Sequence, residues 1–131
     1  KTPGGTDLYI SLDSGSGTLG SDQLEWLEKI LHELRSDYRR CIVFTHINFF
    51  RLRHSEISNP EVEELDVLID LFTRYHVDML VSGHDHKRSE EVFGITTYIV
   101  LEPLKDNTDN AGYLDFNVKN GVITYKFERF N

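Results

Sequence analysis

The fold of this 131-residue chain is best approached from the segment Leu80-Val81-Ser82-Gly83-His84-Asp85-His86-Lys87-Arg88. The apolar run at residues 77–81 has the length and composition of a buried strand. Two imidazoles stand two positions apart just beyond it, and the preceding glycine permits a tight turn that would bring both rings inward. Neutral imidazole is the commonest metal ligand, and a pair suits Zn, Mn, Fe or Ni. The segment therefore predicts half of a metal site at the end of a central strand.

Hydrophobic periodicity predicts two helices and several short strands elsewhere in the chain. The first helix should start at a Ser21 or Asp22 cap, with Glu25 completing a capping box, and end near residues 36–37. The second should start at Asn59-Pro60, with proline at the first helical position. Strands are expected at residues 8–12, 40–45 and 77–81, followed by shorter segments at 91–93, 96–101, 113–118 and 122–127.

This order predicts an α/β fold, β-α-β-α-β, with parallel core strands and an antiparallel β tail. Each of the first three strands is separated from the next by a crossover of helix length, which favours parallel pairing. Residues 1–131 are expected to form a single unit, with residues 1–6 as a flexible lead-in. Ligands of such sheets gather at the carboxyl ends of the strands.

Composition limits the classes of partner. The formal net charge is −8, from 14 Lys and Arg against 22 Asp and Glu. This charge disfavours a nucleic-acid backbone or an anionic membrane as a partner, although a metal could still attract a phosphate. The single cysteine, Cys41, is expected to be a buried hydrophobic residue. Because the chain opens Lys1-Thr2-Pro3 without a methionine, we expect it to be part of something longer.

Three histidines share one predicted position, the carboxyl end of a strand. His46 directly follows the second strand, and His84 and His86 follow the third. If these strands are neighbours, the three rings lie on one rim of the sheet, close enough to share an ion. The remaining histidines are expected to face solvent: His32, His54 and His76.

These residues carry a resemblance to a known family. The run Ile42-Val-Phe-Thr-His46 and the later Leu80-Val-Ser-Gly-His-Asp-His86 resemble the carboxy-terminal half of the calcineurin-like metallophosphoesterases, whose last two motifs are a strand-end His and Gly-His-x-His. Tyr9-Ile-Ser-Leu-Asp-Ser14 and Gly20-Ser-Asp-Gln-Leu-Glu-Trp-Leu27 also look like that family, which has a Gln-Leu-x-Trp-Leu helix at this point. The resemblance covers nearly the whole chain and implies half of an α/β sandwich.

The resemblance implies phosphoester hydrolysis at a site with two divalent metals, Mn, Fe or Zn. His46 and His84 would bind one metal and His86 the other. Two cations about 3.5–4 Å apart polarise the phosphoryl oxygens and generate hydroxide at neutral pH. The expected small-molecule partner is a phosphoester. Tyr98 and the loop at residues 102–112 are expected to border the cleft, with Lys87 and Arg88 exposed beside it.

The chain also departs from the family pattern. The motifs Asp-x-His, Gly-Asp-x-x-Asp and Gly-Asn-His-Asp/Glu, which would supply the bridging Asp, an Asn ligand and the catalytic His, do not occur. Asn48 stands where a proline often follows the strand-end His by two, which should affect loop shape only. Without a bridging carboxylate two cations would repel each other. We therefore expect hydrolysis in a longer parent protein, and at most one weakly bound ion and no activity in these residues alone.

Other patterns in the sequence point to different functions. Gly15-Ser-Gly17-Thr-Leu-Gly20 matches a dinucleotide-binding pattern, but the predicted caps follow its third glycine and no acidic residue ends the second strand. The acidic groups at Glu61/Glu63/Glu64 and Glu90-Glu91 match solvated or dipole-stabilising positions better than a carboxylate pair. A non-catalytic interaction or regulatory module with structural histidines stays open as an alternative.

A half sandwich has one further consequence. It would leave apolar surface and strand edges uncovered, which invites pairing with another copy. We therefore expect the isolated chain to self-associate.

Overall fold

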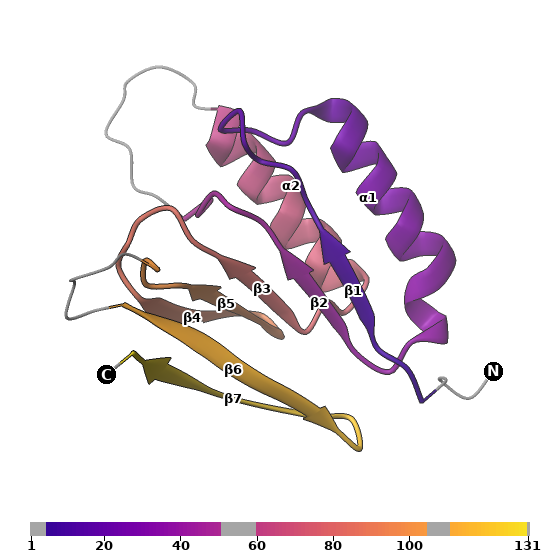
Figure 1. Cartoon of the computed structure of the whole chain (residues 1–131). Helices are drawn as coiled ribbons and strands as arrows, with labels where there is room; N and C mark the ends of the chain where they lie inside the picture. Colours follow the sequence, from indigo (N-terminus) through magenta and orange to yellow (C-terminus); the bar gives the residue numbers. More distant parts are fainter. Residues whose placement is uncertain (1–4, 51–59, 105–110, 131) are drawn as a thin grey trace.

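The computed structural model describes residues 5–50, 60–104 and 111–130, which form three layers (Figure 1). Their elements follow in the order β1 (Leu8–Ser11), α1 (Ser21–Leu34), the 3-10 helix η1 (Arg35–Asp37), β2 (Cys41–Phe44), α2 (Pro60–Arg74), β3 (Met79–Ser82), β4 (Ser89–Phe93), β5 (Thr96–Val100), β6 (Gly112–Lys119) and β7 (Val122–Arg129). The predicted elements are all present, and most boundaries agree within one or two residues. Within the described residues no helix is both long and apolar enough to cross a membrane.

The central layer is a five-stranded sheet with the order β1-β2-β3-β5-β4. The first three strands pair in parallel, which confirms the predicted α/β fold. The prediction that all strands after β3 form an antiparallel tail was wrong for β5, which pairs in parallel with β3. The physical reason is the antiparallel β4–β5 hairpin, which turns the chain back so that β5 runs in the direction of β3.

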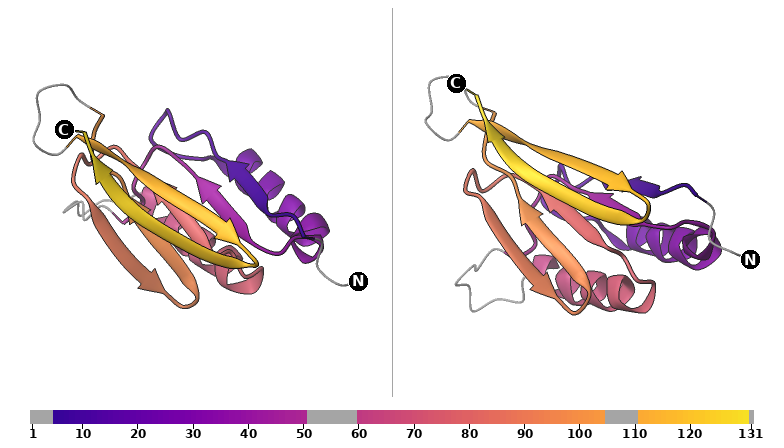
Figure 2. Two further views of the ribbon diagram at one scale, coloured as in Figure 1. Left: turned by 60° about the horizontal axis from the view of Figure 1, so that its bottom comes forward. Right: turned by 90° about the horizontal axis from the view of Figure 1, so that it is seen from below.

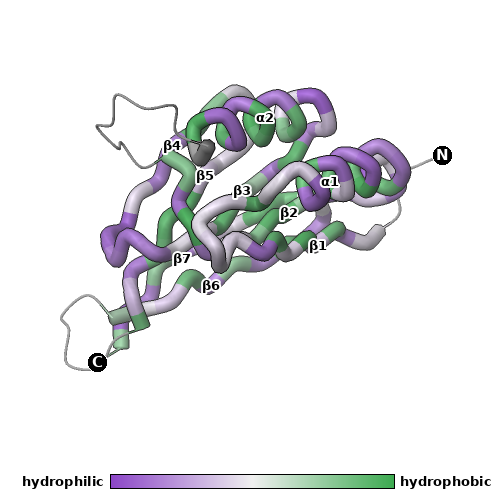
Figure 3. The backbone as a smooth tube through the Cα atoms, turned by 90° about the horizontal axis from the view of Figure 1, so that it is seen from above, coloured by the Kyte–Doolittle hydropathy of each residue, from purple (hydrophilic) through white to green (hydrophobic). Residues whose placement is uncertain are grey.

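The other two layers cover opposite faces of this sheet. Helices α1 and α2 lie on one face, and the separate β6–β7 hairpin lies across the other (Figures 1 and 2). Side chains alternate between the two interfaces, so Val43 and Leu80 pack under the helices while Ile42 and Val81 face the hairpin. Figure 3 shows the hydrophobic residues running along β1, β2 and β3, whereas the outer turns of α1 are hydrophilic.

The start of α1 differs from the prediction. Gly20 occupies the N-cap position with φ 77°, and neither Ser21 nor Asp22 caps the helix through its side chain. The backbone amides of Leu19 and Gly20 instead donate to the carboxylate of Glu64, both at 2.8 Å. Glu64 is only 8% exposed, so it has a structural role in holding α2 against the loop before α1. The predicted capping box at Ser21 or Asp22 and Glu25 was therefore wrong: the carboxylate at the start of α1 comes from Glu64 on α2, which a local sequence pattern does not reveal.

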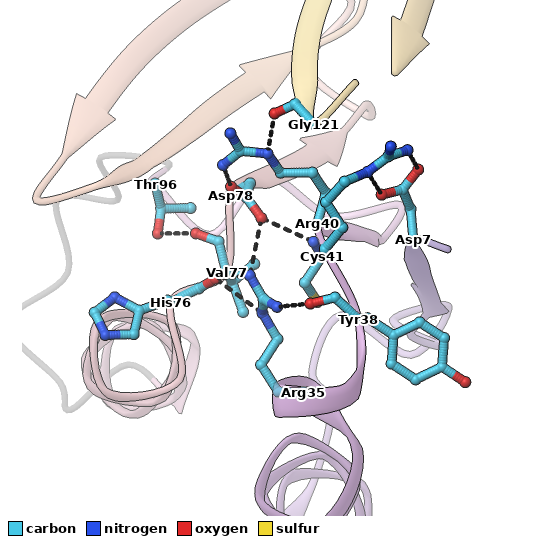
Figure 4. Close-up of polar contacts among 11 residues, drawn as sticks. Asp7, Arg35, Tyr38, Arg40, Cys41, His76, Val77, Asp78, Thr96 and Gly121 are labelled. Atoms are coloured by element: carbon cyan, nitrogen blue, oxygen red, sulfur yellow. Dashed lines mark hydrogen bonds and ion pairs between the residues drawn. The ribbon is translucent and has the colours of Figure 1, made fainter. Parts of the chain in front are cut away.

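A cluster of charged residues fixes the amino-terminal ends of β2 and β3 (Figure 4). The Asp78 carboxylate accepts hydrogen bonds from the Cys41 amide at 2.8 Å, from Arg35 at 3.2 Å and from Arg40. Arg35 also donates to the carbonyl of His76, at 2.8 and 3.0 Å. This cluster sets the register of the two strands whose opposite ends carry the candidate site.

Candidate metal site and adjoining cavity

His46 and His84 are brought together by the pairing of β2 with β3, in which Phe44 lies beside Val81. The pairing continues into the loops, since the Gly83 amide donates to the His46 carbonyl at 3.0 Å. The His46 Nε2 and His84 Nδ1 atoms are 3.1 Å apart, and the rings meet edge to face at 86°. The expected adjacency of the two strands is therefore present, and it places both imidazoles on one rim.

His86 lies near this pair without completing a three-ligand cluster. His46, His84 and His86 all line one cavity. Among residues 5–50, 60–104 and 111–130, however, no group of three or more His, Cys, Asp or Glu side chains is placed to hold one metal ion. The structure thus brings two of the predicted ligands into contact and the third to the same wall. Of the histidines expected to face solvent, His32 and His76 do so, and His54 lies outside the described residues.

The loop after β3 has an unusual backbone. His84 has φ 68° and His86 has φ 54°, both in the left-handed region. The sequence-based reason for this turn was wrong, because Gly83 does not have positive φ and the two histidines themselves carry the turn. Left-handed conformations of residues other than glycine cost about 1–3 kcal/mol each and persist where the surrounding structure enforces them, as at functional sites.

Ser14 supports His46 and was not recognised from the sequence as part of the site. Ser14 is only 1% exposed. Its hydroxyl oxygen accepts hydrogen bonds from the amides of His46 at 3.0 Å and Ile47 at 2.9 Å. The Thr45 hydroxyl donates to the same oxygen at 2.7 Å. Ser14 therefore fixes the backbone from which the His46 ring extends. A serine just after one strand of a parallel sheet was the available signal.

Asn48 connects the two histidine-bearing loops. Its side-chain amide donates to Asp85 Oδ2 at 2.7 Å, and its carbonyl oxygen accepts from the Phe50 amide at 3.0 Å. Asp85 lies between His84 and His86, so the contact joins the loop after β2 to the loop after β3. Asn48 is only 8% exposed, and it shapes the loop as expected.

The separation of the two imidazole nitrogens provides a test of fit to a metal ion. Ligand bonds of about 2.0–2.1 Å that meet at tetrahedral or right angles leave two nitrogens about 2.9–3.4 Å apart. The observed 3.1 Å falls in that range. The same distance also suits a hydrogen bond between neutral rings, in which one nitrogen donates and the other accepts. The pair therefore fits two ligands of a single ion, with the remaining ligands supplied from elsewhere.

The histidines open onto a cavity of about 640 Å³ between the two sheets. Residues before and after the 105–110 segment border it, including Leu101, Glu102 and Gly112, in agreement with the predicted role of that loop. Tyr98 does not border it, because its side chain points to the helical face and packs on Phe72. A strand buried on both faces gives no signal of which face each residue takes.

The basic residues after His86 do not line the cavity. Lys87 and Arg88 are exposed, as expected. The Arg88 guanidinium lies 4.6 Å from the centre of the Phe127 ring, where it forms a cation–π contact with the hairpin. Arg88 is thus directed toward β7.

No family model and no curated protein matches this chain. Among solved structures, GAP50, described as the anchor in the inner membrane complex of Plasmodium, superposes with a TM-score of 0.71 at 15% identity, over 92% of this chain and 44% of that chain. The chain shares the fold of part of GAP50. It spans less than half of the GAP50 chain, and at this identity the likeness concerns the fold alone.

Two structures of Vps29 mutants from Entamoeba histolytica also match. The double mutant has a TM-score of 0.28 at 14% identity, over 97% of this chain and 84% of that one. The single mutant has a TM-score of 0.26 at 15% identity, over 95% of this chain and 99% of that one. These scores are too low to support any conclusion about the fold or the site.

Proposed function

We propose that this domain supplies histidine ligands to a metal centre that hydrolyses phosphoesters, as its resemblance to the calcineurin-like metallophosphoesterases implies. The observation that carries the proposal is the 3.1 Å approach of His46 Nε2 and His84 Nδ1 at the carboxyl ends of adjacent parallel strands. This edge of a parallel sheet is where ligands bind in open α/β folds. The third histidine of the motif, His86, lines the same cavity.

The resemblance implies a role for each histidine. His46 and His84 would hold one divalent ion, and His86 would contribute to a second. Bound divalent ions would supply Lewis-acid polarisation of the phosphoryl oxygens and a hydroxide nucleophile. Ser14 and Asn48 hold the two histidine-bearing loops in place and so orient the rings. They are positioning residues, since Ser14 is bonded to the backbone amide of His46 and Asn48 to the side chain of Asp85.

The 131 residues alone should not catalyse the reaction. The sequence lacks the motifs that would provide a bridging carboxylate, and no carboxylate in the described part of the chain joins the imidazole pair in a three-ligand group. One weakly bound ion is the most that two imidazoles hold, with water in the other positions. Turnover would need carboxylate ligands from further residues of a longer protein.

A second candidate is a non-catalytic interaction or regulatory module. The observation that favours it is the same pair of rings, because a direct hydrogen bond between His46 and His84 satisfies both nitrogens without a metal. In this case the histidines would be structural and would stabilise the contact between the two loops.

Metal binding by the 131-residue protein separates the two candidates. We expect titration with ZnCl2, followed by calorimetry and by imidazole NMR shifts, to give one site that is lost in His46→Ala and in His84→Asn. Asparagine is used at position 84 because it tolerates the left-handed backbone there. The control His32→Ala removes an exposed ring far from the site and should leave binding unchanged. Equal zinc affinity in all four proteins would favour the structural role.

Activity is then tested in a longer parent protein with an aryl phosphate monoester and diester, with and without Mn²⁺. We expect turnover that requires the metal and is abolished by His84→Asn and His86→Asn but retained by His32→Ala. Turnover that survives the loss of His84 and His86 would contradict the proposal.

A further inference from the structure

The cavity beside the histidines exists because the inner face of the hairpin is incompletely covered. Leu114 and Phe116 of β6 point toward the five-stranded sheet, yet both side chains are only partly buried. Phe116 reaches Phe44 of β2, with ring centres 6.3 Å apart, but space remains next to this contact. Unfilled space lined by hydrocarbon forfeits the dispersion contacts that a filled interface makes.

The polar and apolar parts of this cavity are separated. The three histidines line the cavity from the loops that follow β2 and β3, whereas hydrocarbon dominates the rest of the wall among the described residues. The apolar lining comes from both sheets and the chain between them: Phe44, Val81, Leu101, Leu104, Leu114 and Phe116. Among the described residues of the wall, the one carboxylate is that of Glu102, which lies 3.8 Å from the guanidinium of Arg129. A volume of about 640 Å³ is within the usual range for small-molecule sites.

We propose that this cavity binds the apolar group of an amphiphilic phosphoester, an alkyl or aryl phosphate whose phosphoryl group lies at His46, His84 and His86. The identification of the head group rests on the function proposed above; the apolar body is inferred from the cavity wall. A small polar phosphoester would leave the Leu101, Leu114 and Phe116 surfaces uncovered. An alkyl or aryl group of suitable length fills that space while its charged end stays at the imidazoles.

Binding of alkyl phosphates of increasing chain length tests the proposal directly. The 131-residue protein is titrated with ethyl, butyl, hexyl and octyl phosphate as monomers, with and without one equivalent of Zn²⁺, and followed by NMR. The expected dissociation constant falls about fourfold for each added methylene until the cavity is filled. The Leu114 methyl signals should shift with the chain, and the imidazole signals with the phosphate. Octanol should shift only the methyl signals.

Two variants on one face of β6 provide the matched control. Leu114→Thr places a hydroxyl in the cavity wall and should abolish the dependence on chain length. Val118→Thr makes the same kind of change on the inner face of the same strand, at a residue that does not line the cavity. It should keep the dependence. If both variants behave alike, the effect belongs to hairpin docking and the proposal fails.

The outcomes distinguish this inference from the proposed function. Chain-length-dependent binding without zinc affinity would leave the apolar site standing and remove the metal centre. Zinc binding at His46 and His84 with equal affinity for ethyl and octyl phosphate would do the reverse. Failure to bind any alkyl phosphate, with the Leu114 methyl signals changing only with protein concentration, would overturn the inference and assign the cavity to a second copy of the chain.

Discussion

Substitution of Ser14 by alanine tests how the site is held in place. The hydroxyl oxygen of this buried residue accepts from the amides of His46 at 3.0 Å and Ile47 at 2.9 Å. Alanine removes the acceptor with little change in volume, so the buried Ile47 amide and the partly buried His46 amide would both be left without it. A buried donor left unsatisfied costs about 1–3 kcal/mol, and since only the Ile47 amide is fully buried we expect Ser14→Ala to lower the free energy of unfolding by about 1–3 kcal/mol.

Urea denaturation followed by circular dichroism measures this loss. Ser16→Ala is the matched control, because Ser16 is exposed in the same loop and donates only one bond, to the carbonyl of Thr18 at 3.2 Å. It should change stability by less than about 0.5 kcal/mol. Amide hydrogen exchange should show that the His46 amide is deprotected in Ser14→Ala beyond the global loss. If the two serine variants are equally stable, Ser14 does not anchor the His46 loop.

Three further predictions concern other parts of the molecule. Gly83→Ala should be tolerated, because an added Cβ would lie 3.8 Å from its nearest neighbour. Gly112→Ala should weaken the hairpin, because its Cβ would collide with the Glu128 carbonyl. In thermal melts the Gly112 variant should therefore unfold at a clearly lower temperature than the Gly83 variant. Burial raises the pKa of the Cys41 thiol to about 12 from its ordinary 9.0, so between these values the thiol ionises only in the unfolded protein. The free energy of unfolding should therefore fall by up to about 1.4 kcal/mol per pH unit above pH 9.0. Cys41→Ala should lessen that fall in urea titrations at about pH 8 to 10. Self-association should occur through the edge strand β1, which carries no charged residue, and a monomer mass independent of concentration in sedimentation experiments would count against it.

The fold was largely predictable because its signals are local. Apolar runs of strand length and hydrophobic periodicity at helical spacing predicted the β-α-β-α-β order, and helix-length crossovers implied parallel pairing. The position of β5 beside β3 was missed, because strand order in a sheet depends on contacts between distant segments. The cap of α1 was missed for the same reason, since the carboxylate of Glu64 comes from another helix.

In the candidate site, too, the features with a local sequence signal were predictable and those that depend on contacts between distant segments were not. The approach of His46 to His84 was predictable, since each follows a buried strand and the two strands are neighbours. The support from Ser14 depends on one hydroxyl reaching across to another strand end, which no periodic pattern encodes. The left-handed backbone of His84 and His86 was not predictable either, because histidine, although enriched in this region compared with most residues other than glycine, adopts it in only a small minority of cases.

The bonds from Ser14 also link the His46 imidazole to the outermost strand of the sheet. Ser14 follows β1, whose outer edge is unpaired in the described structure, while its hydroxyl is bonded to the backbone that carries the ring. A polypeptide that paired with this edge and displaced β1 by a fraction of an ångström would pull on His46 directly. A partner bound at the β1 edge could thereby change the affinity of the imidazole pair for a ligand without contacting either ring.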